Sequence, residues 1–179
     1  MPLAFTTDAA TLSAGLLLAR LVLGLAMAAH GAQKLFGWFG GHGLAGTAGF
    51  FGSLGFRPAR LFATAAAVTE VGSGLLVALG LLGPVGPALM ISLMIVAMLA
   101  VHAKAGFFAQ SGGIELALLY AVGAFALALT GPGAYSLDAL LGLDALTSSA
   151  VAVTAVVAGV LGGAVALLLR RPAPAVSGD

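Results

Sequence analysis

Five long apolar segments, separated by short breaks rich in glycine and proline, constrain this chain more than any other feature. They cover about residues 11–34, 58–83, 88–103, 115–130 and 148–169. About 20 apolar residues in a helix cross a hydrocarbon core of about 30 Å. The composition agrees, because charged residues make up 7% of the chain, against about 25% in soluble domains. The sequence therefore predicts an all-α integral membrane helical bundle in contact with a lipid bilayer.

The composition also excludes several classes of function. The chain contains no cysteine, so it cannot form disulfides, thiolate nucleophiles or cysteine-ligated metal or iron–sulfur centres. Its net charge of +1 provides no basic surface for nucleic acid. The first residues, MPLAFTTDAATLS, lack the positive charges of a secretory signal, so we expect the first helix to be retained. Any redox chemistry needs a cofactor that is not covalently bound.

The distribution of charge predicts the topology. With five spans, all the basic residues between spans fall on one side: Lys34, Arg57, Arg60, Lys104, Arg170 and Arg171. The opposite side carries only acidic residues: Asp8, Asp138 and Asp144. Since loops rich in lysine and arginine stay in the cytoplasm, we expect the N-terminus outside and the C-terminus inside.

The chain reads as a single membrane domain, residues 1–179. Its expected parts are a four-helix core at 13–130, an outer interfacial loop at 131–147, a fifth helix at 148–169 and a flexible cytoplasmic tail at 170–179. The glycine-rich stretch from His42 to Phe56 is expected to be an interfacial loop or a short helix. The short amphipathic pattern at 136–146 suggests a helix on the surface.

Two opposite charges lie inside the apolar segments. An arginine in hydrocarbon costs roughly 2.5–3.5 kcal/mol, so Arg20 in the first segment should face other helices. Glu70 lies near the middle of the second segment, on a stripe of small residues. Counting residues from the expected helix ends puts both side chains near the midplane. We therefore predict a buried Arg20–Glu70 ion pair, which is either a structural clasp or part of a functional site.

A second polar group gathers at the expected cytoplasmic boundary. It comprises His30, Gln33 and Lys34 at the end of the first helix, His102 and Lys104 at the end of the third, and Glu115 at the start of the fourth. Each has an ordinary explanation by itself, such as the helix dipole for Glu115. Three helices that bring His30, His102 and Glu115 to one level nevertheless predict a shared pocket. The same three side chains could hold a metal, but their spacing matches no metal motif, so no metal site is assigned.

Further residues are expected to line this pocket: Gln33, Lys34, Trp38, Gly74 and Gly113. Trp38 belongs to a run of aromatic residues and glycines after Lys34, which is typical of a chain leaving the bilayer. Simple anchoring at the headgroups is therefore one interpretation of Trp38, and a wall of the ligand site is the other. Gly159 and Gly163 in the fifth helix form a GxxxG pair, which is weak evidence for a homo-oligomer.

An ordered series of motifs resembles the DoxX family. The motifs run from Arg20-x-x-x-Gly24 and His30-Gly31-x-Gln33-Lys34-Leu35-x-Gly37 to Glu70-x-Gly72-x-Gly74 and Leu79-Gly80, then His102, Gly106-Phe107-Phe108 and Gly112-Gly113-x-Glu115. The resemblance covers roughly residues 13–130. It implies a small bacterial four-helix membrane protein of the plasma membrane, with a redox role near the quinone pool. A fifth helix and an acidic outer loop depart from that pattern.

The resemblance suggests a hypothesis for the mechanism. A quinone ring could accept hydrogen bonds from His30 or His102, with Glu115 or a histidine passing protons from the cytoplasm. The chain would then need a soluble or membrane redox partner protein to exchange electrons. Two other classes stay open: a carrier for a small solute or protons, and a non-catalytic membrane subunit for assembly or cargo binding. Against the carrier hypothesis, the sequence lacks the inverted repeat and the broken helices that are typical of transporters.

Overall fold

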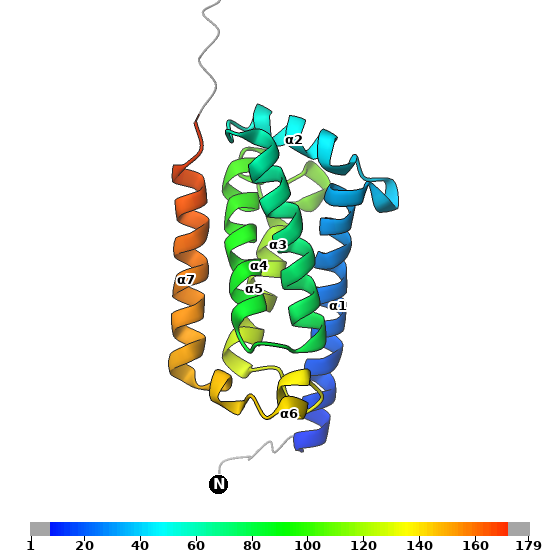
Figure 1. The fold of residues 1–179 in the computed structure, drawn as a ribbon, viewed down its shortest axis with the longest axis vertical. Helices are drawn as coiled ribbons and strands as arrows, with labels where there is room; N and C mark the ends of the chain where they lie inside the picture. The colour runs from blue at the N-terminus through cyan, green and yellow to red at the C-terminus, as the bar shows by residue number, and fades with distance from the viewer. Residues whose placement is uncertain (1–7, 172–179) are drawn as a thin grey trace, which may run out of the picture.

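The structure, a computed structural model, describes residues 8–171, and all the regular elements in that range are helical. Five helices lie side by side along the long axis: α1 (Ala9–Phe36), α3 (Ala59–Leu79), α4 (Val85–Val96), α5 (Glu115–Thr130) and α7 (Ser149–Leu168) (Figure 1). A short helix covers each end of the bundle: α2 (Gly43–Ser53) and α6 (Leu137–Leu141). This architecture confirms the predicted all-α membrane bundle. The predictions for residues 1–7 and 172–179 lie outside the described residues.

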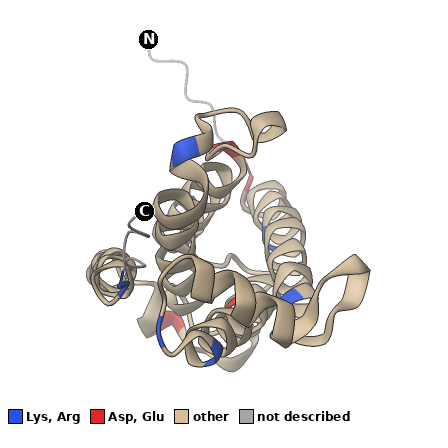
Figure 2. Ribbon diagram, turned by 90° about the horizontal axis from the view of Figure 1, so that it is seen from above, with Lys and Arg blue, Asp and Glu red and all other residues tan. Residues whose placement is uncertain are grey.

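Four helical stretches are long and apolar enough to cross a membrane: α1, α3, Val85–Ala105 and α7. The stretch Val85–Ala105 combines α4 with a π-helical segment, Ala97–His102, and a 3₁₀ turn, Ala103–Ala105. Helix α5 is also apolar but has only 16 residues, so it spans about 24 Å at 1.5 Å per residue. Seen from above, α7 stands at the edge of the bundle, and the other long helices lie around its middle (Figure 2).

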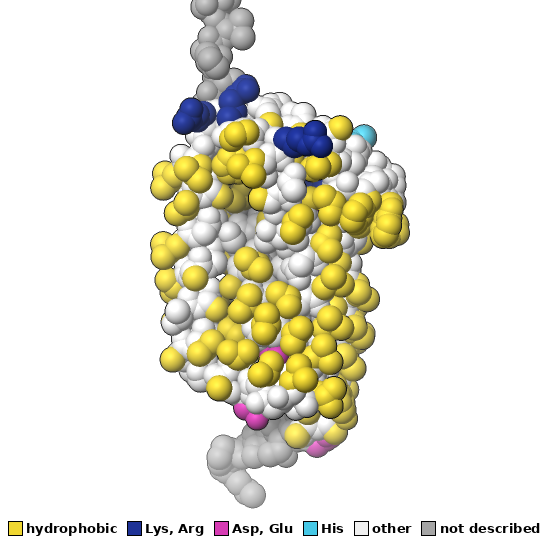
Figure 3. Space-filling view, viewed as in Figure 1, with side chains coloured by type: hydrophobic (Ala, Val, Ile, Leu, Met, Phe, Trp, Pro, Cys, Tyr) yellow, Lys and Arg dark blue, Asp and Glu magenta, His cyan; other side chains and the backbone are white. Residues whose placement is uncertain are grey.

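Charge is segregated between the two ends of the molecule (Figure 3). We call the end with Arg57, Arg60 and Arg170 the basic end, and the end with Asp8 and Asp144 the acidic end. Hydrophobic side chains cover the flank between the two ends. Such an apolar band between charged rims is what a bilayer requires of a multi-pass protein.

Glycines set how the long helices pack. A Cβ atom on Gly24 of α1 would lie 2.5 Å from the carbonyl oxygen of Gly74 in α3, and one on Gly31 would lie 2.6 Å from the backbone nitrogen of Val71. The two helices are therefore in direct backbone contact along their length. Because they run antiparallel, residues opposite each other have numbers that sum to about 100, which fixes the register of α1 against α3.

The glycine pair of α7 is used inside the chain. Gly159 packs against the backbone of Ala88 in α4, and a Cβ atom on Gly163 would lie 2.9 Å from the carbonyl oxygen of Ser92. Both glycines are buried. The GxxxG pair therefore joins α7 to α4 and is not free to join two copies of the chain, which corrects its interpretation as a sign of oligomerisation.

The acidic end is closed by a buried carboxylate. Asp138 of α6 is only 2% exposed, and it accepts hydrogen bonds from the backbone N–H groups of Leu82 (2.8 Å) and Gly83 (2.6 Å) in the α3–α4 turn. The amphipathic pattern predicted a surface helix here, and the helix does form. Its aspartate, however, points inward, because the tight turn between α3 and α4 presents two N–H donors that need an acceptor.

Candidate functional site

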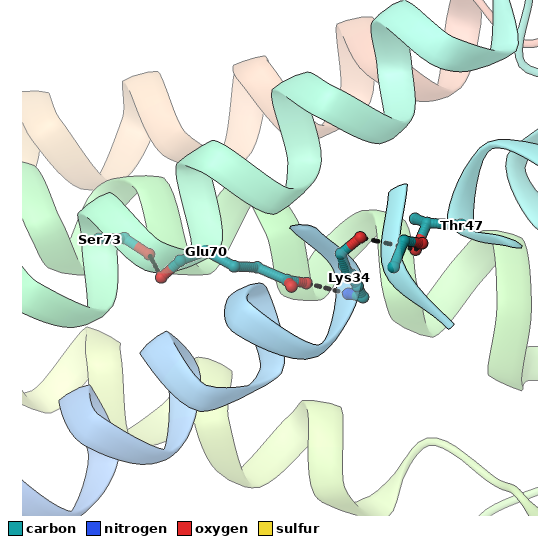
Figure 4. Close-up of polar contacts among 5 residues, drawn as sticks. Lys34, Thr47, Glu70 and Ser73 are labelled. Atoms are coloured by element: carbon teal, nitrogen blue, oxygen red, sulfur yellow. Dashed lines mark hydrogen bonds and ion pairs between the residues drawn. The ribbon is translucent and has the colours of Figure 1, made fainter. Parts of the chain in front are cut away.

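The centre of the candidate site is an ion pair between Lys34, near the basic end of α1, and Glu70 of α3 (Figure 4). The Lys34 ammonium group binds Oε1 of Glu70, while Oε2 is buried and has no hydrogen-bond partner. The hydroxyl group of Thr47 in α2 donates to the carbonyl groups of Lys34 (3.2 Å) and Gly43 (2.8 Å). Helix α2 is thus fastened over the end of α1 that presents the lysine.

This pair replaces the one predicted between Arg20 and Glu70. Both side chains are buried as expected, 2% and 4% exposed, but they do not meet. The guanidinium group of Arg20 instead donates through Nη2 to the carbonyl oxygen of Tyr135, close to Gly80 and Ser136 at the acidic end. Its Nε and Nη1 atoms have no hydrogen-bond partner.

The register between α1 and α3 explains the correction. Gly24 lies opposite Gly74, so Arg20 lies near the level of Gly80, whereas Glu70 lies near the level of Gly31. Ten residues of α3 separate Glu70 from Gly80, which is about 15 Å along the helix axis. Arg20 therefore reaches the acidic end and Glu70 finds its cation at the basic end.

A cavity of about 250 Å³ lies beside this pair, between α1, α4 and α5. We call it the polar cavity. Its polar side chains are His30, Lys34, Glu70, His102 and Tyr120. Met27, Met94 and Leu116 supply apolar wall, and Gly113 leaves room beside them. The structure thus brings five of the predicted site residues together: His30, Lys34, Glu70, His102 and Gly113.

The environment of His102 fixes which of its ring nitrogens carries a proton. Its Nδ1 atom lies 2.6 Å from the carbonyl oxygen of Gly112. A carbonyl oxygen only accepts hydrogen bonds, so Nδ1 must be the protonated nitrogen. In the neutral ring Nε2 is then an acceptor, and it becomes a donor only when the ring is an imidazolium. The π-helical segment that ends at His102 widens this part of the helix, a feature often found at functional sites.

Helices α1 and α5 meet at the cavity through two rings. His30 and Tyr120 pack edge to face, with ring centroids 6.0 Å apart and an interplanar angle of 77°. Tyr120 was not predicted as a site residue. The sequence does contain a signal for Tyr120, because its hydroxyl group is one of the few polar groups in the apolar segment 115–130.

The other predicted site residues lie elsewhere. Glu115 does not line the polar cavity, because its carboxylate accepts a hydrogen bond from the backbone N–H group of Ala109 (2.8 Å) and holds the loop before α5. Gln33 donates to the carbonyl oxygen of Phe39 (3.2 Å). Trp38 is 59% exposed and packs against Phe36, which fits anchoring and corrects its assignment to a pocket wall.

Two further expectations change with this geometry. Gly74 is buried against the backbone of α1, so it serves helix packing and does not line the cavity. Within residues 8–171, no group of three histidine or acidic side chains is placed to hold a metal ion. The alternative in which His30, His102 and Glu115 bind a metal therefore finds no support in the geometry.

A larger cavity of about 560 Å³ adjoins the first one. We call it the apolar cavity. It lies between α3, α4 and α7, beneath α2, and is lined largely by apolar side chains, among them Phe50, Phe51, Phe62, Ala66, Leu93 and Ala166. Lys34, Glu70, Ala97 and His102 line both cavities. These four residues therefore form the boundary between a polar and an apolar compartment.

The family model described as DoxX matches residues 15–103 of the chain, which include most of α1, all of α3 and α4, and the shared boundary residues of the two cavities. No curated protein and no solved structure matches the chain.

Proposed function

The chain belongs to the DoxX family of membrane proteins, and on that premise we propose that it is the membrane component of a quinone-linked oxidoreductase system, with the quinone ring bound in the polar cavity. One observation carries the proposal: two histidines, a tyrosine and a partly buried ion pair converge on one small cavity of an apolar bundle. Ionisable residues within a membrane domain typically mark functional sites. A quinone needs such a site, because its ring carries two polar oxygens on an otherwise apolar body.

The ring nitrogens of His102 define how it serves a quinone. Since Nδ1–H is engaged by Gly112, the free Nε2 of neutral His102 accepts a proton from a quinol hydroxyl group. The imidazolium form donates a hydrogen bond to a quinone carbonyl group. His30 and Tyr120 supply the hydrogen bonds on the facing side of the cavity. His102 is therefore a proton acceptor for the quinol and a proton donor for the quinone.

Glu70 takes the role that the sequence suggested for Glu115. Interconversion of quinol and quinone moves two protons and two electrons. The free Oε2 of Glu70 lies buried beside the cavity, and Lys34, whose side chain is 35% exposed, connects the pair to the basic end. Protons pass through His102 and Glu70, and a partner redox protein takes up or supplies the electrons, since this chain has no cysteine with which to store them.

The orientation of the protein belongs to the same proposal. The basic end carries the lysines and arginines between spans, so it faces the cytoplasm of a bacterial cell, with the N-terminus outside. The polar cavity then lies in the cytoplasmic half of the membrane, and the partner protein docks from the cytoplasm.

Quinone binding by the purified protein in lipid nanodiscs tests the proposal. The probe is decylubiquinone, and its dissociation constant is measured for wild type, His102→Ala and Glu70→Gln. We expect at least a tenfold weaker interaction for His102→Ala, about the effect of losing one hydrogen bond to a charged group. Two matched controls are His42→Ala, an exposed histidine before α2, and Asp144→Asn, an exposed carboxylate at the acidic end; neither residue lines the polar cavity.

Each outcome bears on the proposal. Weaker binding by the cavity variants, with both controls unchanged, supports it. Absence of saturable binding to wild type, or equal loss in all four variants, contradicts it. Uptake of small solutes or protons by the purified protein in liposomes, without quinone binding, would favour the carrier instead.

A further inference from the structure

The two cavities have complementary chemistry and a common boundary. Where they meet, the walls are polar, with Lys34, Glu70 and His102. Away from this boundary the apolar cavity is lined by aromatic rings, including Phe50, Phe51 and Phe62. A site that is polar at one end and apolar at the other fits an amphiphile with a small head and a hydrocarbon tail.

The dimensions of the apolar cavity suit such a tail. Along α3 it extends from Glu70 to Phe62, eight residues or about 12 Å. Its volume of about 560 Å³ lies within the usual range for ligand pockets, which is about 300–1,000 Å³. Small side chains, Ala65 and Ala66 on α3 and Ala166 on α7, leave this space open between the two helices.

The walls of the apolar cavity are held in place. The C-terminal end of α7 is tied to the α2–α3 loop, because Arg170 donates through Nε to the carbonyl oxygen of Leu54, and the Arg171 N–H group donates to that of Gly55 (2.8 Å). Gly163 fixes the same helix against α4. The space is therefore bounded by helices fastened to one another, which distinguishes it from a groove that loose packing would leave.

We infer that the apolar cavity binds the isoprenoid tail of the quinone, so that the substrate class is long-tailed quinones and not tail-less ones. This inference rests on the proposed function, because it takes the ring to lie in the polar cavity. Lys34, Glu70, Ala97 and His102 line both cavities, so the head and the tail of one molecule can occupy the two cavities together. This favours the quinone tail over an acyl chain of a bilayer lipid, because a bilayer lipid has no head group suited to His102 and the buried carboxylate of Glu70.

Filling the cavity from α3 tests the inference. Ala66 lines the apolar cavity but not the polar one, so Ala66→Phe places a ring where the tail would lie. Val68, which is 52% exposed on the same helix and lines neither cavity, gives the matched control Val68→Phe. Ala65 also lines the apolar cavity but is exposed, so Ala65→Phe is a second blocking variant in case Ala66→Phe fails to fold. Dissociation constants are measured in nanodiscs for decylubiquinone and for the same ring without the decyl tail.

We expect the blocking variants to weaken decylubiquinone binding about tenfold, with binding of the tail-less ring unchanged and Val68→Phe like wild type. If both probes bind wild type and neither responds to the blocking variants, the tail lies elsewhere or a bilayer lipid fills the cavity, and the inference fails while the proposed function stands. Equal loss for both probes also overturns it. If neither probe binds wild type, the proposed function fails and the inference fails with it.

Discussion

The ammonium group of Lys34 neutralises one oxygen of the Glu70 carboxylate and leaves the other buried without a hydrogen-bond partner. The lysine side chain is 35% exposed and the glutamate side chain 5%, so the pair joins a partly hydrated position to a dry one. A carboxylate in such a place is costly without its cation. The relationship therefore makes the stability of the bundle depend on both residues together.

Substitution of Lys34 by methionine should destabilise the protein strongly. Losing one partner of a buried pair costs about 3–5 kcal/mol, and we expect the lower end of this range because water screens Lys34 in part. The free energy of unfolding in mild detergent measures the effect. The double variant Lys34→Met with Glu70→Gln should recover most of the loss, because no uncompensated charge is then buried. Additive losses in the double variant would show that the two residues do not act as a pair.

Asp138 should be sensitive to loss of its charge even though it carries no predicted function. Its two oxygens accept from the N–H groups of Leu82 and Gly83, and an asparagine would turn an amide donor toward one of them. We expect Asp138→Asn to lower the free energy of unfolding by about 1–3 kcal/mol. Exposed Asp144 gives the control Asp144→Asn, which should change little. Faster proteolysis within residues 131–147 of the first variant would locate the damage, and equal behaviour of the two variants would argue against a buried acceptor.

Two glycines on α3 should respond to alanine with opposite signs. At Gly74 a Cβ atom would lie 2.5 Å from backbone atoms of α1, whereas at Gly72 it would meet nothing within 4 Å. Gly74→Ala should therefore cost about 1–3 kcal/mol by pushing the helices apart. Gly72→Ala should stabilise by about 0.4–1 kcal/mol through the unfolded chain. Thermal unfolding in detergent compares the two, and similar effects at both positions would contradict the observed register.

Gly163 should matter for the fold and not for self-association. Gly163→Ala places a Cβ atom 2.9 Å from the Ser92 carbonyl oxygen, so it should reduce stability by about 1–3 kcal/mol. Light scattering of the purified protein should give the same mass for this variant and for wild type. The neighbouring exposed residue provides a control, Ala164→Leu. A change of mass with unchanged stability would instead indicate that Gly159 and Gly163 form a contact between two copies of the chain.

The helices could be predicted well because membrane-spanning segments are recognised in a sequence by their length and apolar composition. Helix α5 begins and ends where the sequence suggested, at Glu115 and Thr130, because a glycine-proline break follows directly. Asp8 caps α1 by accepting from the Thr11 N–H group (2.8 Å), and aspartate is a preferred residue at this position. These are local signals, which a single segment contains in full.

The partners of buried charges could not be predicted in the same way, because they depend on how far one helix slides along another. Depth estimates placed Arg20 and Glu70 together, yet α1 runs on to Phe36 and its glycines fix the slide against α3. Lys34 was predicted as a marker of topology and as a pocket-lining residue, but nothing local in the sequence shows that its side chain turns toward Glu70. The register between two helices is a property of the pair, so it cannot be predicted from the sequence of either helix alone.

Helix α7 has a consequence for how the protein is made. Among the described helices it is synthesised last, and it supplies a wall of the apolar cavity through Ala166. A chain truncated before Ser149 would keep every residue that lines the polar cavity and would lose this wall. The two cavities therefore require different lengths of the chain.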